Sequence, residues 1–220
     1  EEHEFFNVQI IPAQTQRYEV ERYLELLDTL GISGGMRDYT MTISTAIREK
    51  ARMKYFSGEL EARKDMLAAF DLTREIVGDS ITRKQAESVI SSLVSDLDLS
   101  ILVFFEPDKR PIAASLKETF GKRVVLVEDR PVSTAAGLLS FCNFVVAHNT
   151  DLFQLAIALK VPVIGILTKG EMIQWSPGQS DRIIHIERSI LAWPSSAIIS
   201  QTAKKFLRKK KLPEQQDTQS

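Results

Sequence analysis

The sequence predicts an α/β protein with a Rossmann-like, doubly wound parallel sheet that follows a helical linker. After residue 65, short apolar runs alternate regularly with amphipathic helical patterns. Several of these runs, such as Phe144 to Ala147, are apolar without a break, which is typical of strands covered on both faces. Strands that alternate with helices along a chain imply right-handed crossovers and therefore a parallel sheet.

The first part of the chain, residues 1 to 64, is predicted to be an interdomain linker with helices. An apolar stripe of helical period runs from Arg17 to Leu30, and a strand-like YTMTI begins at Tyr39. Ser44 is placed to cap a second helix whose apolar side includes Ala51. These helices are poor in core residues, so we expect them to pack on a larger neighbour.

The second part, residues 65 to 211, is predicted to be the Rossmann-like domain, and residues 212 to 220 a disordered polar tail. The expected strands are Met66 to Leu72, Ser100 to Phe105, Arg123 to Val127, Asn143 to Ala147, Val161 to Leu167 and Arg182 to Ile186. The expected helices are Arg83 to Val94, Lys109 to Phe120, Ser133 to Phe141, Asp151 to Leu159 and Ser195 to Arg208.

Composition narrows the class of protein. The 220 residues are 44% hydrophobic, but no apolar run reaches the roughly 18 to 20 residues of a membrane span. The first residues, EEHEFF, do not have the pattern of a signal peptide. We therefore expect a cytoplasmic protein. The single cysteine, Cys142, is expected to be a buried structural thiol. Three scattered histidines predict no metal site, and a net charge of -1 predicts no nucleic-acid partner.

Motifs for common enzyme classes are missing from the sequence. The first strand is followed by TREIVGDS, which has one glycine in place of the three of GxGxxG. Neither the phosphate-binding GxxxxGK[ST] nor the hydrolase elbow GxSxG occurs. We therefore expect no nicotinamide or flavin cofactor, no P-loop chemistry and no serine hydrolase.

Polar residues follow each predicted strand at the same edge of the sheet, where open α/β sheets bind ligands. The loops concerned are Thr73 and Arg74, Glu106 to Lys109, Glu128 to Val132, Asn149 to Gln154, and Thr168 to Trp175. The stretch His148 to Gln154 is the leading candidate, because a helix begins there directly after a buried strand. The loop TKGEMIQWSPG is long for an α/β connection, which indicates function.

Each candidate also has a purely structural interpretation. Asn149 and Thr150 are also suitable as helix caps, Lys169 as a solvated charge and Trp175 as a packing aromatic. The basic run KKFLRKKK is typical of a solvated helix face, with contact to anionic lipid as the other interpretation.

The stretch from Asn143 to Gly178, NFVVAHNTDLFQLAIALKVPVIGILTKGEMIQWSPG, resembles the C-terminal signature of glycosyltransferase family 9, the lipopolysaccharide heptosyltransferases. That signature is roughly v-v-x-x-D-T-G-x-x-H-L-A-x-A-L-x-x-P-v-i-x-l-f-G-p-t-x-p-x-x-W-x-P. Without a gap, the following residues match it: Thr150, Leu155, Ala156, Ala158, Leu159, Pro162, Trp175 and Pro177. Upstream, HEFFNVQ and RYEVERYLELLDTLGI resemble the interdomain segment of the family.

The resemblance implies the C-terminal half of a GT-B enzyme that binds a nucleotide-diphospho-sugar, usually ADP-heptose, for lipopolysaccharide core or related glycan synthesis. It implies a glycolipid acceptor, peripheral contact with the inner membrane, and a general base in an N-terminal domain on the same or a separate chain. The expected donor-binding residues are Asn149, Thr150, Asp151, Leu152, Gln154, Thr73, Arg74, Asp129, Val132 and Lys169.

The sequence also departs from the family pattern. Asn149 replaces an aspartate, Asp151 a glycine and Gln154 a histidine, while Thr168 and Lys169 replace Gly-Pro. The family's lysine-and-tryptophan stretch before the second helix is replaced by GDSITRKQ. A carboxylate at position 151 would repel a diphosphate. The alternative interpretation is therefore a non-catalytic GT-B-like module, or a degenerate fragment that serves as a structural partner.

Overall fold

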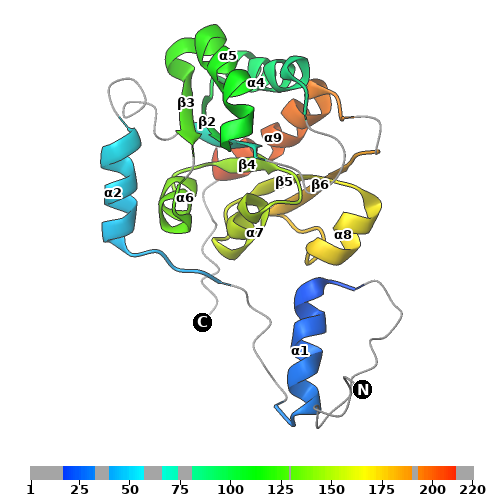
Figure 1. Ribbon diagram of the computed structural model, residues 1–220. Helices are drawn as coiled ribbons and strands as arrows, with labels where there is room; N and C mark the ends of the chain where they lie inside the picture. Colours follow the sequence, from blue (N-terminus) through cyan, green and yellow to red (C-terminus); the bar gives the residue numbers. More distant parts are fainter. Residues whose placement is uncertain are drawn as a thin grey trace, which may run out of the picture.

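The computed structural model describes residues 17–32, 40–56, 66–73, 81–128, 130–189 and 193–211. Six parallel strands form one sheet in the order β3-β2-β1-β4-β5-β6 (Figure 1). The strands are β1 (Leu67–Leu72), β2 (Ser100–Phe105), β3 (Val124–Glu128), β4 (Phe144–Ala147), β5 (Val163–Leu167) and β6 (Ile183–Glu187). This order confirms the Rossmann-like, doubly wound sheet.

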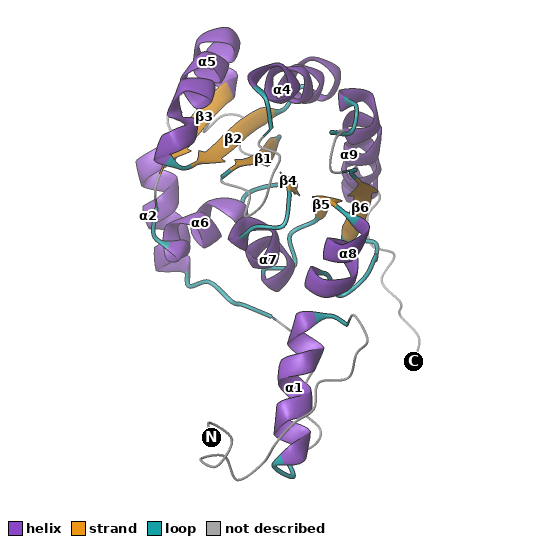
Figure 2. Ribbon diagram, turned by 45° about the vertical axis from the view of Figure 1, so that its right-hand side comes forward, coloured by secondary structure: helices purple, strands orange, loops and turns teal. Residues whose placement is uncertain are grey.

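Helices lie on both faces of the sheet. The helices that the structure describes are α1 (Glu19–Thr29), α2 (Thr45–Tyr55), α4 (Arg83–Leu97), α5 (Arg110–Phe120), α6 (Val132–Leu139), α7 (Asp151–Ala158), α8 (Lys169–Trp175) and α9 (Ser196–Lys211), with short 3-10 turns at Pro107–Lys109 and Gly121–Arg123. Helix α1 lies apart from the sheet (Figure 1). Helices α4, α5 and α9 pack on one face and α2, α6 and α7 on the other (Figure 2). Every residue of β1 and β2 is buried between these layers, as their unbroken apolar runs predict.

Strand register places the carboxyl ends of β1 and β4 side by side. Phe70 of β1 is opposite Val146 of β4, while Leu72 is opposite Phe105 of β2. The chain order reverses between β1 and β4, so the sheet's topological switch point lies at this junction. The loop after β1 and the turn after β4 therefore meet at one position.

Part of the predicted linker packs on the sheet domain. Ser44 accepts a hydrogen bond from the backbone N–H of Ile47, which caps α2 as predicted. Ala51 of α2 is buried against α6, where Gly137 provides room for the close approach. The division of the chain near residue 64 stays a prediction.

Two local predictions were wrong. The described part of YTMTI, residues 40 to 43, forms no strand, because Met41 donates its backbone N–H to the Ala158 carbonyl at the end of α7, at 2.7 Å. The stretch Lys169–Trp175, predicted as loop, is α8. Its cause is local: Thr168 and Glu171 form a reciprocal capping box that starts a helix.

The remaining predictions about the chain concern its cysteine, membrane-spanning helices and its tail. Cys142 is buried, as predicted, and burial raises the pKa of its thiol. Within the described ranges, no helix is both long enough and apolar enough to cross a membrane. The predicted tail at 212 to 220 lies outside the described residues.

Candidate functional site

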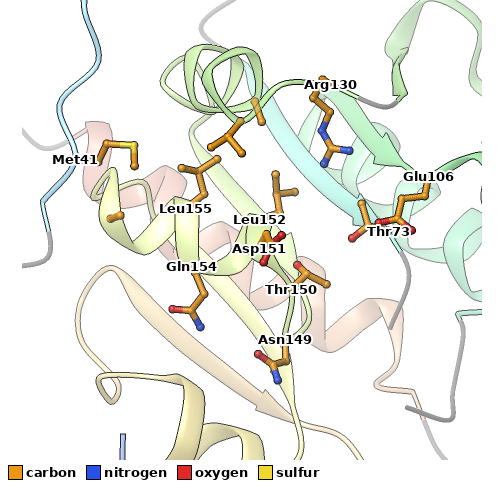
Figure 3. Close-up of a pocket in the computed structure, with 13 residues that line it drawn as sticks. Met41, Thr73, Glu106, Arg130, Asn149, Thr150, Asp151, Leu152, Gln154 and Leu155 are labelled. Atoms are coloured by element: carbon orange, nitrogen blue, oxygen red, sulfur yellow. The ribbon is translucent and has the colours of Figure 1, made fainter. Parts of the chain in front are cut away.

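A cleft of about 870 Å³ lies at the carboxyl edge of the sheet, beside the switch point. It is bounded by the ends of β1, β2 and β4 and by helices α6 and α7 (Figure 3). The lining residues are Met41, Thr73, Glu106, Arg130, Val132, Ala135, Asn149, Thr150, Asp151, Leu152, Gln154, Leu155 and Ala158.

Most of the residues predicted from the sequence meet in this cleft. Those that line it are Thr73, Val132, Asn149, Thr150, Asp151, Leu152 and Gln154. Lys169 is exposed at the start of α8 and is not one of the described residues that line the cleft. Arg74 and Asp129 lie outside the described residues.

A buried carboxylate next to the cleft accepts hydrogen bonds from two of the lining residues. Asp71, near the end of β1, is 1% exposed. Its Oδ1 accepts hydrogen bonds from the backbone N–H of Thr73 at 3.0 Å and from the Thr73 hydroxyl at 2.6 Å. Its Oδ2 accepts one from the Thr150 hydroxyl. The only acid in an otherwise apolar strand, LAAFDL, is the signal in the sequence that could have identified this residue.

Thr150 is the N-cap residue of α7, but its side chain makes no cap hydrogen bond. The hydroxyl is directed to Asp71 instead. The sequence had predicted a hydroxyl that serves either the helix or a ligand, and the structure shows a third partner. Asp151, the first residue of α7, is exposed at the cleft.

The charged side chains among the described lining residues are Glu106, Asp151 and Arg130. The guanidinium carbon of Arg130 lies 4.8 Å from the centre of the Phe104 ring, a cation–π contact that holds the side chain over the end of β2. Figure 3 shows the guanidinium directed from the α6 side into the cleft. Glu106 and Arg130 lie within loops that the sequence indicated, but neither was singled out.

The other end of the cleft is apolar. Its walls are Val132 and Ala135 of α6, Leu155 and Ala158 of α7, and Met41 from the segment before α2. Met41 reaches this place because its backbone is hydrogen-bonded to the end of α7. No local pattern in the sequence predicts that contact, which joins residues over a hundred positions apart.

Gln154 links the cleft to α8. Its side-chain amide donates to the backbone carbonyl of Trp175 at 2.7 Å. Beyond that carbonyl, the hydroxyl of Ser176 is hydrogen-bonded to Nε2 of His185 at 2.8 Å. Burial lowers the pKa of His185. His148, which the leading candidate stretch included, is 2% exposed and packs edge-on against Trp193 rather than lining the cleft.

Metal binding gains no support from the side chains: the described residues contain no group of three or more histidine, cysteine or acidic side chains that could hold an ion. The polar groups among the described lining residues are hydroxyls, side-chain amides, one guanidinium and the carboxylates of Glu106 and Asp151, with the amino-terminal end of α7 beside them. Hydroxyls, amides, guanidinium groups and helix amino termini bind sugars and phosphates by hydrogen bonding and charge, whereas carboxylates form hydrogen bonds only with groups that donate.

The sequence matches neither a protein-family model nor a curated protein. Solved structures do match. A family 9 glycosyl transferase from Veillonella parvula has a TM-score of 0.73 at 13% identity, over 93% of this chain and 64% of that one. The ADP-heptose lipopolysaccharide heptosyltransferase II of E. coli has a TM-score of 0.74 at 12% identity, over 93% and 66%.

The E. coli heptosyltransferase WaaC, solved with ADP, has a TM-score of 0.65 at 20% identity, over 92% of this chain and 60% of that one. The chain thus spans 60 to 66% of the length of these three proteins. At such identities the likeness is one of fold. Over 92 to 93% of its length, this chain has the heptosyltransferase-like fold of the family 9 glycosyltransferases.

Proposed function

We propose that this chain is the donor-binding part of a glycosyltransferase of the family 9 type, with a nucleotide-diphospho-sugar, ADP-heptose in particular, as its ligand. The observation that carries the proposal is the cleft at the switch point between β1 and β4. It combines an apolar end, a guanidinium and a helix amino terminus in a fold whose solved neighbours include WaaC with ADP and with ADP-2-deoxy-2-fluoro heptose.

The two ends of the cleft suit the two parts of a nucleotide. The apolar end, between Val132 of α6 and Leu155 of α7, suits the flat nucleobase. The first turn of α7 leaves backbone N–H groups without partners within the helix, and these attract anions. Arg130 adds the positive charge and the paired donors that a diphosphate prefers.

Catalysis in this proposal needs groups from outside the cleft. The leaving diphosphate is stabilised by Arg130 and the α7 amides, while a base removes the proton of the attacking acceptor hydroxyl. We place that base in an N-terminal domain, on the same or a separate chain. The rest of the proposal is a glycolipid acceptor in lipopolysaccharide core or related glycan synthesis, and a cytoplasmic location with peripheral contact at the inner membrane.

Calorimetry with ADP and with UDP tests the binding step. We expect ADP to bind, and Arg130→Gln to weaken that binding about tenfold, the loss of a charge-assisted hydrogen bond. Lys204→Gln is the matched control, because Lys204 is exposed on α9, which packs on the opposite face of the sheet. Equal effects of the two substitutions, or no heat with either nucleotide, would contradict the proposal.

One observation favours a second candidate, a non-catalytic GT-B-like module. Of the three charged side chains among the described lining residues, Glu106 and Asp151 are acidic, and both oppose an anionic ligand. A cleft that has lost donor binding would serve assembly with a partner domain. Absence of binding to ADP, UDP and ADP-glucose by a correctly folded chain would support this candidate.

A further inference from the structure

The hydrogen bonds to Asp71 fix where two hydroxyl protons point. A threonine hydroxyl has one proton to donate and two lone pairs that accept, whereas an ionised carboxylate only accepts. The hydroxyls of Thr73 and Thr150 both donate to Asp71. The protons of both hydroxyls are therefore directed to the buried carboxylate of Asp71 and away from the cleft.

Few other directions are open to these protons. Thr73 also donates its backbone N–H to the same oxygen of Asp71, which keeps the threonine in place. For Thr150 the second acceptor within reach is the backbone carbonyl of His148, at 3.5 Å, the outer limit of a hydrogen bond. Asp71 is 1% exposed, so bulk water has little access to its oxygens.

Thr73 and Thr150 both line the cleft, one after β1 and the other after β4 (Figure 3). With their protons committed, they present lone pairs to a ligand. Lone pairs repel the oxygens of a phosphate, which also only accept, and they bind a group that donates. The hydroxyls of a sugar are such donors.

We propose that Asp71 is a positioning residue that makes Thr73 and Thr150 acceptors, so that this part of the cleft binds a sugar hydroxyl of the donor and excludes the diphosphate. The inference rests on the proposed function for the identity of the ligand. It divides the cleft by chemistry: the diphosphate lies at Arg130 and the α7 amides, and the sugar lies over the two threonines.

Replacing a ligand hydroxyl by fluorine tests the direction of the hydrogen bond, because carbon-bound fluorine cannot donate. The probes are ADP-glucose and four analogues of it, each with one glucose hydroxyl replaced by fluorine. The measured quantity is the ratio of the dissociation constants of each analogue and ADP-glucose. All five probes carry the same diphosphate, so changes in protein charge cancel in the ratio.

For the wild type we expect fluorine at one position to weaken binding about fivefold, the loss of one hydrogen bond. Thr150→Val, or Thr73→Val if that residue makes the contact, should abolish this penalty, since no acceptor remains. Thr150→Ser keeps the hydroxyl and should keep the penalty. Melting curves establish that each variant is folded.

Asp71→Asn should reverse the preference at Thr150. The amide oxygen must face Thr73, because the backbone N–H there can only donate. The amide N–H₂ then replaces Oδ2 and donates to the Thr150 hydroxyl, whose own proton turns to the cleft. Fluorine accepts that proton weakly. The loss of affinity caused by fluorine at the sugar position that contacts Thr150 should therefore fall to about twofold or less.

The results of these binding measurements distinguish an error in the inference about Asp71 from an error in the proposed function. If the wild type binds ADP-glucose and no fluorine position weakens it, or if the penalty is unchanged in both valine variants, the inference is wrong and the proposed function stands. If the wild type binds neither ADP nor ADP-glucose, both are wrong. Should Asp71→Asn fail to fold, the valine variants with Thr150→Ser still decide the result.

Discussion

The hydroxyl of Thr150, in the turn after β4, donates a hydrogen bond to Asp71, near the end of β1. These residues are 79 positions apart, and the bond joins the two strands at the sheet's switch point. It satisfies one oxygen of a carboxylate that is almost fully buried. Thr150 therefore has a role in stability as well as a place at the cleft.

We expect Thr150→Val to lower the free energy of unfolding by about 1 to 3 kcal/mol, because Oδ2 of Asp71 loses its donor in a buried place. Urea denaturation measures the change. Thr150→Ser keeps the donor and should cost clearly less. A loss below about 0.5 kcal/mol for Thr150→Val would mean that water or another donor replaces the hydroxyl.

Asp151 should oppose an anionic ligand while favouring its own helix. As the exposed first residue of α7 it stabilises the helix by roughly 0.3 to 1 kcal/mol. We expect Asp151→Gly and Asp151→Asn to tighten binding of ADP at low salt, with a gain that shrinks as salt is added. Glycine should also lower stability slightly, since it removes the charge and raises backbone freedom.

The matched control for this charge effect is Glu118→Gln, an exposed acid on α5, which packs on the opposite face of the sheet. It should leave the affinity for ADP unchanged within error. An Asp151→Asn variant that binds ADP no better than wild type at low salt would place the diphosphate away from this turn.

Gly137 should be irreplaceable where α2 crosses α6. A Cβ atom at this position would lie 2.9 Å from Cβ of Ala51 and 3.1 Å from the carbonyl oxygen of Ile47, so α2 would have to move. We expect Gly137→Ala to destabilise the protein by about 1 to 3 kcal/mol. Urea denaturation gives the stability, and limited proteolysis after the lysines and arginines of α2 reports its release.

Gly170→Ala is the control variant, and it should change the free energy of unfolding in the opposite direction to Gly137→Ala. Gly170 lies in α8, where an added Cβ atom would meet no atom of the described residues within 4 Å beyond its chain neighbours and the backbone of its own helix, and alanine restricts the unfolded chain. This variant should stabilise by about 0.4 to 1 kcal/mol. If Gly137→Ala and Gly170→Ala change the free energy of unfolding in the same direction and by a similar amount, the close contact between α2 and α6 is not the cause of the effect at Gly137.

His185 should make stability depend on pH in the acid range. Burial lowers its folded-state pKa below the ordinary value of 6.5, so the unfolded chain binds a proton that the folded chain does not. Its contribution is complete above about pH 6.5 and is lost as pH falls below that value, until the folded form also takes up the proton. The slope from this one group cannot exceed about 1.4 kcal/mol per pH unit.

The measurement is the unfolding free energy of wild type and His185→Gln between pH 7.5 and 5, a range of roughly one unit above and more than one below the ordinary value. We expect the wild type to lose more stability than the variant as the pH falls. Parallel curves would show that His185 titrates alike in the folded and unfolded chains.

Local patterns determined much of the architecture. The apolar run of Phe144 to Ala147 is a strand because only a position between two helix layers removes every one of its side chains from water. The alternation of strands and helices predicts a parallel sheet, whose strands all end at the same edge, so the edge that holds the cleft was predictable. Helix α8 was predictable too, since the Thr168 and Glu171 capping box is a local signal.

The contents of the cleft depended on the tertiary structure. Arg130 over Phe104, Met41 at the end of α7 and Asp71 beneath Thr150 each join residues that only strand register and helix packing bring together. By itself, then, the sequence determined the sheet and the edge that holds the cleft, because hydrophobic periodicity acts over a few residues. Which side chains meet there, and where their protons point, was decided by contacts between distant parts of the chain, whose geometry no local pattern contains.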